Sequence, residues 1–63
     1  MTRDPRTNPQ PDDVLHLDGV RWIVVCTRGY IDARREPEGP EGAVRTWVRY
    51  QWIDAMARAE VVS

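Results

Sequence analysis

The segment Val14–Val25, VLHLDGVRWIVV, decides the fold that we predict for this chain. Two β-prone runs flank Asp18-Gly19, a dipeptide that suits a type I′ turn because both turn positions need a positive φ angle. The turn predicts a β-hairpin and sets its register: Leu17 opposite Val20, His16 opposite Arg21, and Leu15 opposite Trp22. Since side chains alternate along a strand, one face is predicted to enter the core. That face carries Leu15, Leu17, Val20, Trp22, Val24 and Cys26.

The opposite face of this hairpin is not purely polar. Ile23 and Val25 lie on it, near His16 and Arg21. Branched aliphatic side chains on the second face predict a sheet that is partly covered on both sides, as in a curled sheet or a small barrel.

The rest of the chain predicts shorter elements. Residues 34–42, RREPEGPEG, have the charge, proline and glycine content of a mobile loop. A strand is expected within 43–53, followed by one or two helical turns in 54–59 and a last short strand at 61–62. This order is that of SH3-like domains. We therefore predict an all-β fold with one short helix, either a small SH3-like barrel or a curled antiparallel sheet.

The composition changes near residue 13. Residues 1–13 contain Pro5, Pro9 and Pro11, and are predicted to form an extended, flexible N-terminal arm that is at most loosely docked. Residues 14–63 are predicted to form a single small domain. With one cysteine and one histidine, the chain can form neither an internal disulfide nor a structural zinc site. The domain must therefore fold on its aliphatic and tryptophan core, or share that core with a second copy.

The charge of the chain is heavy but balanced. All nine basic residues are arginine, and ten carboxylates give a formal net charge of −1. A dedicated phosphate-backbone binder usually has a basic surplus, which is missing here. No glycine-rich phosphate loop, nucleophile elbow or EF-hand ligand order occurs in the sequence. We expect no catalysis, no cofactor and no metal, and, since no apolar run could span a bilayer, a cytoplasmic protein.

Both ends of the chain carry recognisable sequence. The start, Asp4–Leu15 (DPRTNPQPDDVL), and the end, Trp52 followed by Ala59-Glu60-Val61-Val62, resemble small uncharacterised proteins of tailed phages and prophages. Those proteins often have glycine where this chain has Asp12, and a second tryptophan where it has Ala55. The resemblance implies a phage origin and supplies no chemistry. It also implies that the helix begins at Gln51 or Trp52.

The stretch Ala43–Ile53 provides the candidate binding residues. If it is one strand, Val44, Val48, Tyr50 and Trp52 face the core, and the other face carries Arg45, Trp47 and Arg49. An exposed tryptophan between two arginines is typical of a protein-binding anchor. The candidate partner-binding residues are Arg45, Trp47, Arg49, Arg21 and His16.

Three interpretations of this face remain open at this point. It could bind a host or phage protein, as an inhibitor or modulator would, or pair two copies of this chain. It could bind single-stranded nucleic acid, with Trp47 stacking on a base and the arginines meeting phosphates. Alternatively, Trp47 is covered by the N-terminal arm or the 34–42 loop, and the arginines pair with carboxylates. We favour the protein-interaction hypothesis.

Overall fold

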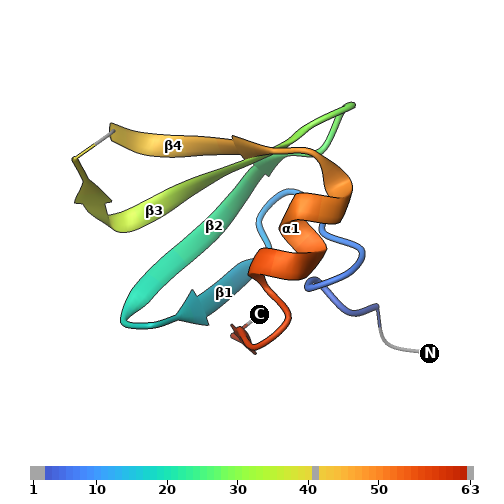
Figure 1. Ribbon diagram of the computed structural model, residues 1–63, viewed down its shortest axis with the longest axis horizontal. Coiled ribbons are helices and arrows are strands. Elements are labelled where there is room, and N and C mark those ends of the chain that lie inside the picture. Colours follow the sequence, from blue (N-terminus) through green and yellow to red (C-terminus); the bar gives the residue numbers. More distant parts are fainter. Residues whose placement is uncertain (1–2, 41, 63) are drawn as a thin grey trace.

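Five strands and one short helix form the structure, a computed structural model that describes residues 3–40 and 42–62. In chain order the elements are β1 (Val14–Leu17), β2 (Val20–Cys26), β3 (Ile31–Gly39), β4 (Gly42–Trp47), α1 (Arg49–Ala55) and β5 (Glu60–Val61). The strands form one antiparallel sheet in the order β4-β3-β2-β1-β5, which curls around the helix (Figure 1). The predicted β-rich fold with one short helix is confirmed. β4 and β5 are the two edges of the sheet.

The β1–β2 hairpin follows the prediction in turn and register. Asp18 and Gly19 have φ angles of 51° and 80°, as a type I′ turn requires. The observed pairs are the three predicted ones, Leu17 with Val20, His16 with Arg21, and Leu15 with Trp22. Leu15, Trp22 and Val24 are buried, and Leu17 and Val20 pack against them. We call this side of the sheet the core face, and the side that carries His16 and Arg21 the outer face.

Replacing the turn glycine, Gly19, tests whether its positive φ angle stabilises this hairpin. Gly19→Ala is expected to lower the free energy of unfolding by about 1 kcal/mol, because a β-carbon is strained at a φ of 80°. The added methyl group would meet no atom within 4 Å, so the loss comes from the backbone alone. A thermal melt followed by circular dichroism should show a midpoint about 4–8 °C lower. Gly19→Asn, which tolerates positive φ, should keep most of the stability; equal losses in both variants would contradict this account.

Most of the predicted 34–42 loop is strand, so that prediction was wrong. β3 continues to Gly39, and β4 begins at Gly42. Arg34, Arg35 and Glu36 pair with β2, and an irregularity follows before Gly39 meets Gly42. A charged segment becomes a strand here because pairing with β2, and with β4 at Arg34 and Gly39, satisfies backbone groups of the segment, an effect that local composition does not report.

The Ala43–Ile53 stretch changes from strand to helix at residue 48. β4 ends at Trp47, and α1 begins at Arg49, earlier than the predicted 54–59 and earlier than the start implied by the phage resemblance. The Gln51 side chain accepts a hydrogen bond from the Val48 N–H at 3.2 Å, which holds the first turn. The last strand is Glu60–Val61, one residue from its predicted place.

The core and exposed positions of this stretch also differ from the expectation. Trp52 is buried as predicted, but it reaches the core from the helix, where Met56 lies one turn further along the same face. Val44 and Tyr50, predicted as core residues, are 56% and 69% exposed. The alternation of side chains along a strand could not describe this segment, because its second half is helical.

Residues 3–13 are turned and docked, which corrects the expectation of an extended arm. The Asp4 carbonyl accepts hydrogen bonds from the Thr7 and Asn8 N–H groups. The buried Trp52 Nε1 donates to the Pro5 carbonyl at 3.0 Å, so the segment lies against the helix (Figure 1). This segment therefore completes the core on the helical side.

The centre of the core is a series of three tryptophans. The rings of Trp22 and Trp47 lie 4.9 Å apart at 77°, and those of Trp47 and Trp52 lie 5.0 Å apart at 79°. Edge-to-face contacts of this kind stabilise beyond the area that they bury. The buried apolar residues are Leu15, Trp22, Val24, Ile31, Ala33, Trp47, Trp52, Met56 and Ala59. In the described part of the chain, no helix is long and apolar enough to cross a bilayer.

Candidate binding groove

The predicted Arg45–Trp47–Arg49 surface does not exist as one exposed face. Trp47 is only 5% exposed, because it lies opposite the buried Ile31 on the core face and between two other tryptophans. Arg49 belongs to α1, so strand alternation does not align it with Arg45. The interpretation in which Trp47 is covered is closest to the structure, although its aromatic neighbours are Trp22 and Trp52.

His16 and Arg21 lie on the outer face, away from Trp47. They are direct cross-strand partners, as predicted. Arg21 also pairs with β3, where its Nη1 lies 3.7 Å from Glu36 Oε1 in an exposed ion pair. Exposed pairs of this kind contribute little to stability. The five predicted residues therefore do not form one surface, and Arg45 is the one that leads to a groove.

Two arginines cover the end of the tryptophan series on the core face. The Arg45 guanidinium lies 5.3 Å from the centre of the Trp47 ring, and that of Arg35 lies 5.5 Å from the Trp22 ring. The register explains the second contact, because Arg35 is the direct cross-strand partner of Trp22. Both side chains place their aliphatic stems beside the core and keep their charges at its rim.

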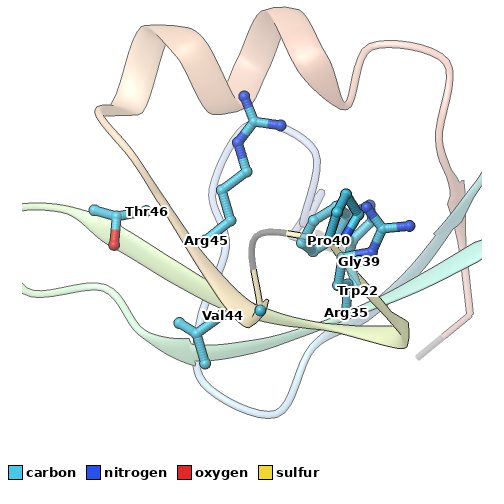
Figure 2. Close-up of a pocket in the computed structure, with 8 residues that line it drawn as sticks. Trp22, Arg35, Gly39, Pro40, Val44, Arg45 and Thr46 are labelled. Atoms are coloured by element: carbon cyan, nitrogen blue, oxygen red, sulfur yellow. The ribbon is translucent and has the colours of Figure 1, made fainter.

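These two arginines line a groove of about 440 Å³ at the end of the β3–β4 hairpin. Trp22 forms part of its wall, and Pro40 and the glycines of the hairpin end border it. Figure 2 shows Arg45 rising from β4 on one side of this groove and Arg35 beside Trp22 and Pro40 on the other. We call it the Arg35–Arg45 groove. A β-carbon at position 39 would come within 2.8 Å of Arg35 Nη1, so Gly39 leaves room for that guanidinium.

No ion pair between described residues occupies the positive charges of the groove. Among residues 3–40 and 42–62, ion pairs join Arg3 to Asp13, Arg6 to Asp4 and Arg21 to Glu36, and none involves Arg35 or Arg45. Arg35 Nε donates a hydrogen bond to the Pro37 carbonyl at 2.9 Å, which orients the guanidinium group. The Nη donors of Arg35 take no part in this hydrogen bond. Two oriented guanidinium groups can bind carboxylates or phosphates through paired N–H donors.

A second depression continues from the first around Arg45. It has a volume of about 420 Å³ and lies between β4 and α1, where Thr46, Gln51 and Asp54 border it. Arg45 lines both depressions and so occupies the position where they meet. A ligand that follows β4 would therefore pass this side chain.

The titratable groups with shifted pKa values lie elsewhere, in the N-terminal segment. Hydrogen bonds from Arg3 lower the pKa of Asp13 below its usual value, although burial opposes the shift. Hydrogen bonds from Arg6 lower the pKa of Asp4. These pairs hold the segment in place and do not border the groove. Among the described residues, no group of three or more His, Cys, Asp or Glu side chains could hold a metal ion.

Arg35 is the groove residue that the sequence argument missed, because it falls in the segment predicted as a loop. A signal for it was present. Ile31 and Ala33 are apolar at a spacing of two, and the next residue on the same face is Arg35. A strand through this segment would have placed Arg35 beside a core tryptophan of the hairpin.

No protein-family model, curated protein or solved structure matches this chain.

Proposed function

We propose that this chain is a small non-enzymatic protein-interaction module whose partner binds at the Arg35–Arg45 groove. The observation that carries the proposal is the pair of guanidinium groups held over Trp22 and Trp47 without a carboxylate partner in the described chain. The resemblance of the chain ends to phage proteins supports a host or phage protein as the partner. An inhibitor or modulator acting in the host cytoplasm would fit such an origin.

The geometry favours a macromolecular partner over an enclosed small molecule. The groove lies along an exposed strand, and its border combines Arg35, Arg45 and Thr46 with apolar residues and glycines instead of forming an enclosed apolar wall. Stacking on the tryptophans restricts both arginines before any partner arrives, so less side-chain entropy is lost on binding. Arginine beside aromatic residues is also common among the side chains that dominate interface affinity.

Binding to single-stranded nucleic acid loses its main support. That alternative required Trp47 to stack on a base, and this side chain is buried between two other tryptophans. The formal net charge of −1 also disfavours a phosphate-backbone binder. We therefore retain protein binding as the proposed function.

Removal of one groove charge provides the test. Arg45→Gln is expected to weaken partner binding tenfold or more, since a hydrogen bond to a charged group contributes about 1.5–3 kcal/mol. The loss of the contact with Trp47 should cost only about 1 kcal/mol of stability, so the variant stays folded. Fragments of the host proteome, displayed and selected on the wild-type domain, supply binders whose affinities are measured by interferometry.

The matched control lies on the other side of the sheet. Arg21→Gln removes the same charge from the outer face, away from the groove, and should leave the affinity within about twofold. The variant should stay folded, because the exposed ion pair of Arg21 with Glu36 contributes little to stability. If the selected fragments bind the Arg45 variant as tightly as the wild type, the groove is not the interaction site. If Arg21→Gln is the damaging change, the site lies on the outer face.

A further inference from the structure

We propose that the ligand of this groove is an extended, acidic peptide segment that adds to the sheet as a strand beside β4. The inference rests on the proposed function, because it names the ligand class of the same groove. It follows from two features that meet at Arg45: the edge of the sheet at β4, and two arginines that form no ion pair with a carboxylate of residues 3–40 and 42–62.

The first feature is the edge of β4. This strand is the last in the sheet order, so alternate residues direct backbone N–H and C=O groups away from β3 with no neighbouring strand. Its six residues contain no proline, and Arg45 is their one charged residue, so the usual devices that block edge pairing are largely missing. The opposite edge, β5, has two residues and offers little length for pairing.

The second feature is the charge beside that edge. A strand added to β4 would lie about 4.8 Å away, and every second side chain would point to the face that carries Arg45. Carboxylates at those positions would meet the Arg45 guanidinium, whereas Arg35 lies further from the edge, over Trp22 of β2. The intervening side chains would lie beside Val44 and Thr46, which extend from the other side of β4 (Figure 2). The expected ligand therefore alternates acidic residues with apolar or β-branched ones.

A second copy of this chain fits the same edge poorly. If two β4 strands paired, both Arg45 side chains would lie close together on one face, and like charges on neighbouring strands are destabilising. A separate acidic segment has the complementary charge. The occupant to which we commit is such a peptide from another protein.

A library of random peptides long enough to span β4, displayed and selected on the wild-type domain, tests this inference. Peptides that also bind Arg45→Gln are removed. We expect the remaining peptides to carry Asp or Glu at every second position and to change the fluorescence of Trp22 and Trp47, which lie under the two arginines. Peptides without that alternation, or a failure to select any, would overturn the inference.

Methylation of single peptide nitrogens then separates strand addition from other modes of binding. N-methylation of the best peptide should weaken binding tenfold or more at alternate amides and little at those between, because only one set faces β4. A uniform effect along the peptide, with binding still lost in Arg45→Gln, would overturn strand addition and leave the groove as a protein-binding site. If every selected peptide binds Arg45→Gln as tightly as the wild type, so that none remains after the removal, both are overturned. Dimerisation of the wild type through β4, detected by sedimentation and abolished by Thr46→Pro, would favour a second copy and overturn the peptide proposal.

Discussion

Trp47→Ala is expected to lower the free energy of unfolding by about 3–5 kcal/mol, the cost of removing a large aromatic side chain from a core. Trp47 is 5% exposed and contacts both other tryptophans, so its removal breaks both edge-to-face contacts of the series. A domain of this length has a total stability of about 3–9 kcal/mol. Urea denaturation followed by far-ultraviolet circular dichroism should therefore show a severely destabilised or unfolded variant.

Tyr50→Ala is the matched control for this large effect. Tyr50 lies three residues away and is 69% exposed, so its removal should change the stability by no more than about 0.5 kcal/mol. If Trp47→Ala melted like the wild type, Trp47 would be a surface residue, and the original interpretation of an exposed anchor would return.

Asp13→Asn is expected to cost about 2 kcal/mol, because it removes the charge that fixes the N-terminal segment. The buried Asp13 carboxylate accepts hydrogen bonds from both Arg3 Nη atoms and, at 2.8 Å, from the Gln10 N–H. The side-chain amide of an asparagine would direct one of its N–H groups toward the N–H donors of Arg3 or Gln10, where no acceptor is present. The same denaturation measurement should show the loss, and a second test follows the pH.

The pH dependence has a definite sign. The pKa of Asp13 is lowered in the folded state, so its contribution is present above the unfolded pKa of about 3.9 and is lost as the pH falls through the lower folded value. The stability difference between wild type and Asp13→Asn should be constant near neutral pH and shrink in acid below about pH 4. Asp12→Asn is the control, since Asp12 is exposed with a φ of 74° that asparagine adopts readily. A difference that grows on acidification would contradict the assignment.

The hairpin was predictable because its determinants are local. Asp18-Gly19 specifies the turn, the turn specifies the register, and the register assigns Leu15 and Trp22 to one face. These inferences required no knowledge of contacts between distant segments.

The candidate site was not predictable in the same way. The side of the sheet on which Trp47 lies could be predicted only by knowing where β4 ends. Tyr50 was assigned to the core by the alternation of a strand, although it lies in a helix. Arg45 was singled out as part of an exposed face opposite the core, whereas it lies on the core face and covers a tryptophan there. Arg35 was hidden in a segment that becomes a strand only through pairing with distant residues.

The fold depends on a tryptophan core, and this explains why the charges of Arg35 and Arg45 lie at the rim of that core. A small chain buries a smaller share of its surface than a larger domain does, so it has few apolar residues with which to cover three indole rings. Arginine covers the open ends of Trp22 and Trp47 through its stem and guanidinium while the charge stays near solvent. The residues that finish the core are thus the same residues that we propose to bind a partner.

Nuclear magnetic resonance titration tests the central claim, that the partner binds at the Arg35–Arg45 groove. The ¹⁵N-labelled domain is titrated with the best acidic peptide from the selection, and the amide shifts are followed. We predict that the changes concentrate in β4 and in residues 35–40, with His16 and Arg21 unaffected. Shifts centred on His16 and Arg21, on the outer face of the sheet, would contradict the account.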